Sequence, residues 1–151
     1  MQKTNERIRT LRDKAGLDAE GLADQIGVTA DWYLNLENEE DELEASLDLS
    51  QILKLSQLLG VSMAFLLTGD PTDASGPPLS FRDLAQGVRR HLEHSGSVEA
   101  LEEKIGWDLS AFLKDPEADG WDQRVPFLRD VCGEVGLDWR AVLRYGQTWG
   151  E

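Results

Sequence analysis

The sequence predicts an all-helical protein, and three features of the chain indicate that fold class. Apolar residues recur three and four positions apart, as in Ile8, Leu11 and Ala15, which is the spacing of one helix face. Polar residues that cap helices, such as Asp18 and Thr29, precede these segments, and glycines follow them. No segment shows the strict alternation of apolar and polar residues that is typical of a half-buried strand. We therefore expect a bundle of short helices joined by short connections.

The same caps and glycines predict five helices within residues 1–69. An acidic stretch at residues 37–46 separates the third of these helices from the fourth. Residues 70–79 concentrate turn-forming residues, so we expect a linker there, followed by a second small helical domain at residues 80–151. The residues that bound the five helices are Gly16, Asp18, Gly27, Thr29, Asp48, Gly60, Ser62 and Gly69.

The second domain repeats the pattern of the first. LEEKIG, at residues 101–106, lies 79 positions after LADQIG, at residues 22–27. Further along, LRDVCGEVGLDWRAVL follows ILKLSQLLGVSMAFLL at an offset of 76, while the expected first helix of this domain, at residues 81–95, matches only loosely. We interpret the repeat as an internal duplication that gives two domains of related topology. The alternative is that a bundle of short helices repeats its glycine caps by chance.

Four stretches of the first domain together carry a resemblance to a known family. They are RIRTLRDKAGL (7–17), GLADQIGV (21–28), LNLEN (34–38) and LLGVSMAFLLTG (58–69). On these stretches, residues 6–69 resemble the Cro and lambda-repressor helix-turn-helix family, also called XRE-like. The resemblance implies that the third helix enters the DNA major groove. It also implies a structural ion pair between Arg12, near the end of the first helix, and Glu37, at the end of the third.

The resemblance places the residues that touch DNA around the start of the third helix. The reading positions are Thr29, Ala30, Asp31 and Asn35. Arg9 of the first helix is expected to touch the phosphate backbone. Asn pairs with adenine, Thr contacts phosphate or the thymine methyl group, and Asp accepts from the cytosine amino group. Our first hypothesis is a transcriptional regulator that binds double-stranded DNA, with the second domain joining two copies in a homodimer.

The charge of the same region favours a different partner. The chain carries a net charge of −14, and the interval between Lys14 and Lys54 holds eleven acids and no Lys, Arg or His. Proteins grip DNA largely through Lys and Arg that displace counterions from phosphates, and an acidic face lacks that contribution. The alternative hypothesis is a helix-turn-helix protein that does not bind DNA and whose acidic face binds a basic protein, as an anti-repressor, adaptor or DNA mimic. A solvated surface loop would explain the same run of acids. The face would consist of Asp31, Glu39, Glu40, Asp41, Glu42 and Glu44.

Large apolar residues lie among these acids. The resemblance implies that Leu34 faces outward, which would give an apolar spot ringed by acids, as suits a protein partner. We expect Trp32 in the core. The tryptophans of the second domain are also expected in the core; they are Trp107, Trp121, Trp139 and Trp149.

No pattern in the sequence indicates an enzyme or a cofactor. His91 and His94, with Glu93 or Cys132, are the candidate metal ligands, and we favour solvent-facing histidines and no metal. Cys132 lies in an apolar helical stretch and is expected to be a buried small hydrophobe. The polar opening of the chain, the lack of a run of membrane-spanning length and the single cysteine predict a cytoplasmic protein that does not enter a membrane.

Overall fold

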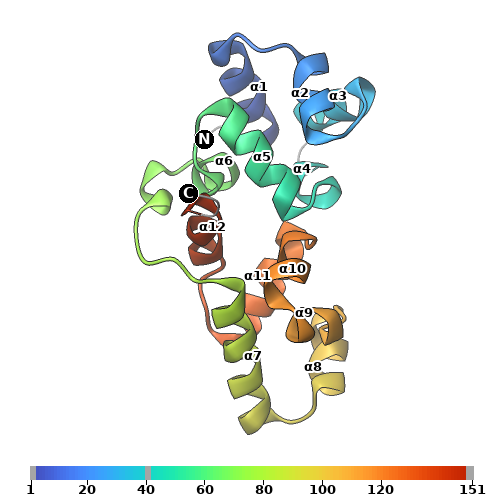
Figure 1. Cartoon of the computed structure of the whole chain (residues 1–151), viewed down its shortest axis with the longest axis vertical. Helices are drawn as coiled ribbons and strands as arrows, with labels where there is room; N and C mark the ends of the chain where they lie inside the picture. The colour runs from blue at the N-terminus through green and yellow to red at the C-terminus, as the bar shows by residue number, and fades with distance from the viewer. Residues whose placement is uncertain (1–2, 40–41, 149–151) are drawn as a thin grey trace.

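The computed structural model of the chain describes residues 3–39 and 42–148. Helices are the only regular secondary structure in that part of the chain (Figure 1). The predicted all-helical class is confirmed. The helices of the first half are α1 (Thr4–Ala15), α2 (Ala19–Ile26), α3 (Ala30–Asn38), α4 (Glu42–Ser46), α5 (Leu49–Leu59) and α6 (Met63–Thr68). A single 3₁₀ turn, η1 (Pro71–Ala74), follows. The helices of the second half are α7 (Phe81–Ser95), α8 (Val98–Ile105), α9 (Ser110–Lys114), α10 (Pro116–Trp121), α11 (Val125–Val135) and α12 (Trp139–Thr148).

Local capping interactions define the turn between α2 and α3. The Gly21 amide donates to Asp18 Oδ1 at 2.6 Å, and the Trp32 amide donates to Thr29 Oγ1 at 3.1 Å, so both helices begin where the sequence predicts. Gly27 ends α2 with a left-handed backbone at φ 81°. A Cβ atom at this position would meet no other atom within 4 Å. Glycine is therefore required by the left-handed backbone conformation and not by close packing.

The acidic stretch at residues 37–46 contains a helix that the five-helix prediction missed. Leu43 and Leu47 are four residues apart, and both are fully buried. Leu43 lies in α4 and Leu47 directly follows it, and α4 forms there although acids dominate the local sequence. α10 (Pro116–Trp121) follows α9 in the second half and was also not predicted.

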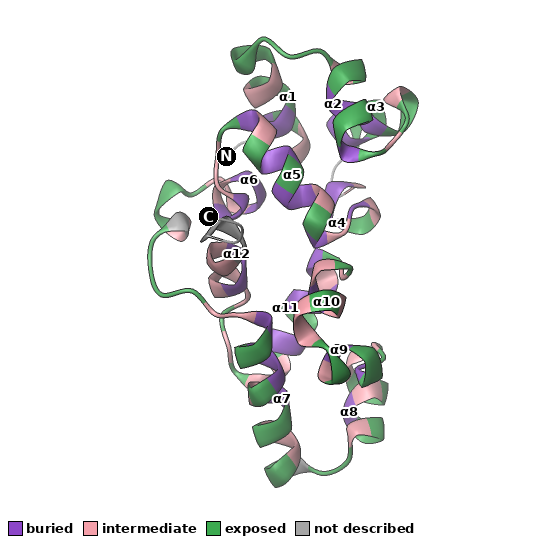
Figure 2. Cartoon of the chain, in the orientation of Figure 1, coloured by how far each residue is buried: buried purple, intermediate pink, exposed green. Residues whose placement is uncertain are grey.

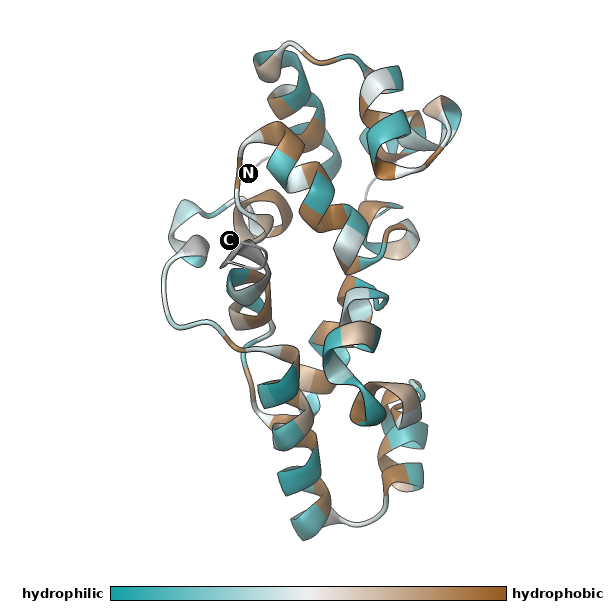
Figure 3. Cartoon of the chain, in the orientation of Figure 1, coloured by the Kyte–Doolittle hydropathy of each residue, from teal (hydrophilic) through white to brown (hydrophobic). Residues whose placement is uncertain are grey.

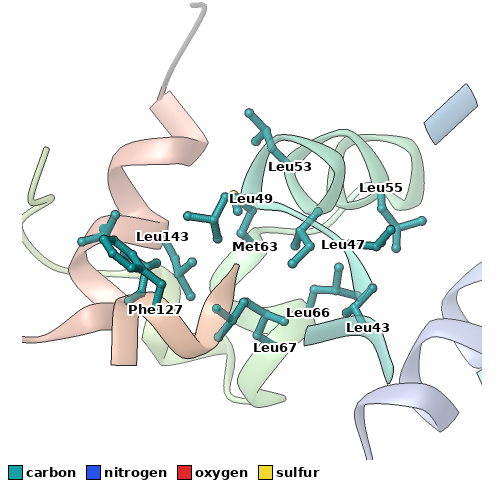
Figure 4. Close-up of a cluster of buried hydrophobic side chains, with 14 of the residues drawn as sticks. Leu43, Leu47, Leu49, Leu53, Leu55, Met63, Leu66, Leu67, Phe127 and Leu143 are labelled. Atoms are coloured by element: carbon teal, nitrogen blue, oxygen red, sulfur yellow. The ribbon is translucent and has the colours of Figure 1, made fainter. Parts of the chain in front are cut away.

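Buried apolar side chains form one cluster that extends through both halves of the chain (Figure 2). Leu49 and Leu67 of the first half and Phe127 and Leu143 of the second belong to this cluster (Figure 4). Hydrophilic residues dominate the outer faces of helices such as α7 (Figure 3). In the described ranges, no helix combines the length and the apolarity needed to cross a bilayer.

The segment expected to be a plain linker, residues 70–79, packs against the second half. Asp73 in η1 accepts from Arg140 Nη1 at 3.2 Å, and its backbone carbonyl accepts from Arg144 Nε at 2.8 Å. The Leu79 amide donates to the carbonyl of Ala141 at 3.0 Å. These bonds tie the connection to α12, so it is a structured part of the fold.

Candidate interaction site on helices α2 and α3

Helix α3 presents a continuous exposed stripe beside α2. Tyr33, Leu36 and Glu37 form its buried face. The opposite face follows the i, i+3, i+4, i+7 spacing of one side of a helix. Its residues are Asp31, Leu34, Asn35 and Asn38, all of them exposed.

The structure separates the residues that the family resemblance assigns to DNA. Asp31 and Asn35 are exposed on the stripe, whereas Ala30 is half-buried and offers no polar side chain. Thr29 is exposed, but its Oγ1 atom already accepts the Trp32 amide. Arg9 lies at the other end of α3, about 12 Å along the helix from its first residue.

Arg9 is held at that end by α3 itself. Its Nη2 atom donates to Asn38 Oδ1 at 2.6 Å and to the Glu37 carbonyl at 3.4 Å. A cation near a helix C-terminus is favourable because it meets the negative end of the helix dipole. The Arg9 guanidinium therefore binds the C-terminal end of α3 and does not approach Thr29.

Arg12 and Glu37 lie together in a bidentate ion pair. Arg12 Nε is 2.5 Å from Glu37 Oε1, and Nη2 is 3.2 Å from Oε2. The Tyr33 hydroxyl donates to the same Oε1 atom at 2.9 Å. Burial, followed by the bond to Glu37, raises the pKa of Tyr33, and the bond to Glu37 raises the pKa of Arg12. Because the Glu37 side chain is only 2% exposed, this cluster stabilises the fold and offers nothing to a ligand.

An open groove runs between α2 and α3, next to the exposed stripe. Its charged lining residues are Asp18, Glu20 and Asp24, and Val28 and Ala30 form part of its floor. Free backbone amides at the start of a helix such as α2 attract anions. Here the Asp18 carboxylate caps those amides, so an anion of the chain occupies the position.

One of the acids that the sequence assigns to the acidic face, Glu44, does not lie on the surface. Glu39 is exposed, and Glu42 accepts from Ser46 Oγ at 2.5 Å. Glu44 requires a correction, because it is buried and accepts from Arg129 Nη2 at 2.7 Å. The α4 helix turns this carboxylate toward α11, a contact between residues 85 positions apart that no local pattern indicates. Glu40 and Asp41 lie outside the described residues.

Trp32 is also placed differently from its prediction. It is 39% exposed, because its position on the helix falls outside the buried stripe of Tyr33, Leu36 and Glu37. Leu34 is 40% exposed, so it faces outward as expected. The two side chains lie about 160° apart around the helix, with Leu34 on the exposed stripe and Trp32 outside it, so they do not form one apolar spot.

A second acidic groove lies between α8 and α9, and the sequence analysis did not identify it. The available signal was LEEKIGWD, the counterpart of LADQIGVT. A backbone bond from Ser110 lowers the pKa of Asp108. Glu102 Oε2 accepts the Leu109 amide at 2.6 Å, and Trp107 Nε1 donates to Asp130 at 2.9 Å. Lining residues of the groove are Glu102, Glu103, Gly106, Trp107, Asp108 and Ser110.

The candidate metal ligands and the cysteine can be placed within the described residues. Among them, no group of three or more His, Cys, Asp or Glu is arranged to hold a metal ion. Cys132 is fully buried, and burial raises the pKa of its thiol to about 12. Trp107, Trp121 and Trp139 are half-buried, and Trp149 lies outside the described residues.

Comparison of the chain with family models, curated proteins and solved structures yields no match.

Proposed function

We propose that the chain is a regulatory protein that uses a helix-turn-helix scaffold to bind a basic protein instead of DNA. The observation that carries this proposal is the acidic groove between α2 and α3, at the position where the family resemblance implies contact with DNA. Its charged lining residues are Asp18, Glu20 and Asp24, and no Lys or Arg is among the residues that line it.

Electrostatics make this groove a poor surface for DNA. A complex with DNA derives much of its affinity from each Lys or Arg that neutralises a phosphate and releases a counterion. A carboxylate in the same position repels the phosphate, and salt screens that repulsion only beyond about 8 Å under physiological conditions. The surface is better matched to the positive charge of a basic protein.

The arginines of α1 are engaged within the fold and do not compensate for these acids. Arg7 is buried and donates to the Leu66 carbonyl at 2.6 Å. Arg12 pairs with Glu37, and Arg9 is bound to the C-terminal end of α3. The three arginines of α1 therefore support the scaffold.

The exposed stripe of α3 indicates the chemistry of the partner. Asp31 supplies a carboxylate that an arginine fork can bind through two hydrogen bonds. Asn35 and Asn38 each offer an amide, and Leu34 offers an apolar surface at the edge of the stripe. We expect a partner that presents Arg or Lys together with a small apolar contact.

DNA binding is the second candidate function. It is favoured by the exposure of Thr29 and Asn35, which are the reading positions with side chains suited to base or phosphate contacts. Under this candidate, duplex affinity falls steeply as salt rises.

Fluorescence anisotropy with two probes separates these functions. The probes are a labelled random-sequence duplex and a short arginine-rich peptide, each titrated with the full chain at low and at physiological salt. We expect the wild-type chain to bind the peptide and to ignore the duplex even at low salt. Salt-sensitive binding of the wild-type chain to the duplex, with no binding to the peptide, would reject the proposal in favour of DNA binding.

Charge reversal tests the location of the site. The double variant Asp24→Lys with Asp31→Lys is expected to weaken peptide binding and to gain duplex affinity at low salt. Glu6→Lys with Glu93→Lys, two exposed reversals on α1 and α7, is the control of equal charge change and is expected to change neither titration. If this control weakens peptide binding as much as the groove variant does, the peptide responds to net charge alone and the groove is not the site.

A further inference from the structure

We infer that this chain is the single-chain counterpart of a symmetric homodimer. Its two units, residues 4–68 and 81–148, each contain six helices and pack about an approximate internal two-fold axis. The chain is then a monomer that presents both grooves as a fixed pair. The part of this inference that concerns the partner rests on the proposed function.

The helices of the two units follow one another in the same order, and two pairs also match in length and in the glycine that ends them. α2 and α8 each contain eight residues and start 79 positions apart, and α5 and α11 each contain eleven residues and start 76 positions apart. Gly27 and Gly106 end the first pair, and Gly60 and Gly136 end the second. All four glycines have left-handed backbones, with φ between 72° and 81°.

Several helix pairs of the first unit recur in the second, although the packing of α3 on α1 and α2 is not matched to the same extent by α9. α1 contacts α4 and α5, as α7 contacts α10 and α11. α2 contacts α5 as α8 contacts α11, and α3 contacts α4 as α9 contacts α10. α5 contacts α6 as α11 contacts α12. Chance recurrence of glycine caps would reproduce helix ends but not this set of neighbours.

Corresponding positions fill corresponding places in the core. Tyr33 and Phe112, 79 positions apart, are both fully buried. Ser56 and Cys132, 76 positions apart, are also both fully buried, and each puts a small side chain into a crowded position. These matches connect the two sequence offsets to the packing of the units.

The contacts between the units are those of an isologous interface. In such an interface, a contact from one element to another is accompanied by the reverse contact. α4 packs on α11, and α10, the counterpart of α4, packs on α5, the counterpart of α11. α6 packs directly on its own counterpart, α12, near the middle of the molecule (Figure 1).

Polar and apolar contacts hold this interface together. Arg129 of α11 pairs with Glu44 of α4, and its guanidinium lies 4.6 Å from the centre of the Trp139 ring. The Leu49 amide donates to the Gln123 carbonyl at 2.8 Å. Since the second half of the chain covers the surface that a symmetric dimer would bury, we infer a monomer in place of the homodimer that the sequence suggests.

The arrangement gives the partner a second property besides its positive charge. α2 and α3 lie on the same side of the molecule as α8 and α9, one pair in each unit (Figure 1). A groove lies within each pair, and Asp24 and Glu103 occupy equivalent positions in the two grooves, 79 residues apart. A basic protein that is itself a two-fold dimer can bind both grooves at once, with the gain in affinity that linked sites provide.

Sedimentation equilibrium of the full chain tests the internal two-fold arrangement. We expect a monomer of 16.9 kDa at every concentration, because the interface is already occupied within the chain. A reversible dimer would overturn the inference. As a second measurement, Glu44→Arg is expected to lower the melting temperature, and Glu44→Arg combined with Arg129→Glu is expected to recover most of the loss. Failure of the exchanged pair to recover stability would contradict the contact between the units.

Paired use of the grooves is tested with one arginine-rich peptide and with two copies of it joined by a flexible linker. The joined peptide is expected to bind the wild-type chain at least about tenfold more tightly than the single peptide. Asp24→Lys alone and Glu103→Lys alone should each abolish that gain, while single-peptide binding persists at the intact groove. Equal affinity of the two probes would overturn paired binding and leave the proposed function standing. If neither probe binds, the proposed function is rejected. The sedimentation experiment still tests the internal two-fold arrangement independently.

Discussion

Glu37 of α3 accepts both Nε and Nη2 of Arg12 of α1, at 2.5 and 3.2 Å, and the pair joins the first helix to the third. Arg12 Nη1 also donates to the Leu17 carbonyl at 3.1 Å, in the turn that leads into α2. One guanidinium therefore contacts α1, α3 and the connection to α2. The orientation of the exposed stripe of α3 depends on this contact, although none of its members lies on the stripe.

Loss of the Arg12 side chain should destabilise the first unit. Arg12→Ala leaves the buried Glu37 carboxylate with the Tyr33 hydroxyl and the more distant Arg9 Nε, at 3.8 Å, and we expect a loss of about 1–3 kcal/mol in the free energy of unfolding. Urea denaturation followed by circular dichroism measures it. Lys14→Ala, an exposed change on the same helix, should stay within about 0.5 kcal/mol of wild type. A wild-type urea midpoint for Arg12→Ala would show that the pair contributes nothing.

Glu44 and Glu39 belong to the same acidic stretch but should respond differently to neutralisation. Glu44 is 9% exposed and paired with Arg129, so Glu44→Gln leaves that guanidinium without its counter-charge. We expect the melting temperature to fall by several degrees, which corresponds to about 1–2 kcal/mol in a chain of this length. Glu39→Gln, at an exposed position, should leave the melting temperature unchanged. Equal effects of the two changes would mean that the stretch acts only through its total charge.

Gly120 and Gly133 both lie within helices of the second unit, and alanine should have opposite effects at the two positions. A Cβ atom at Gly120 would lie 2.5 Å from ring atoms of Phe81, which is buried against Trp121 and Tyr145. Gly120→Ala should cost about 1–3 kcal/mol through overpacking. Gly133→Ala meets no atom within 4 Å and should stabilise α11 by about 0.5–1 kcal/mol. Calorimetry of both variants checks the signs, and a stabilised Gly120→Ala would contradict the packing around Phe81.

Cys132 should report on unfolding by its reactivity. Burial is the main reason that the pKa of its thiol rises to about 12, so the folded protein keeps the thiol protonated at neutral pH. Because the neutral form is favoured in the folded state, this group's contribution to stability holds below its ordinary pKa and is lost as pH rises toward 12. A thiol-reactive dye at pH 8 should label the native protein very slowly and the urea-unfolded protein at once. Complete labelling of the native chain within the mixing time would contradict the burial of Cys132.

Most helix ends could be predicted from the sequence, because they depend on residues close together in the chain. Asp18 and Thr29 cap helices by bonding to amides three residues away, and Gly27 ends one by its backbone conformation. Short helices inside charged stretches were missed. Leu43 in α4 and Leu47 directly after it are a weak signal among acids, and the short helix forms only because the core receives both side chains.

The candidate site also has some features that the sequence predicts and others that only tertiary packing decides. The position of the α2–α3 turn and its surplus of negative charge follow directly from the order of the residues. The surroundings of individual acids do not, because exposure depends on which elements pack nearby. Glu44 meets Arg129 across 85 positions, whereas Glu39, only five positions earlier, stays exposed.

The amino-acid order alone determined the helical class, the places where most helices begin and end, and the two offsets at which the pattern returns. Those properties arise from hydrogen bonds and backbone preferences that act over three or four residues. Tertiary packing decided which arginines remain on the surface, which carboxylates are paired, and how α6 meets α12. Such contacts join segments separated by tens of residues, and their energy exists only once the two units share a core.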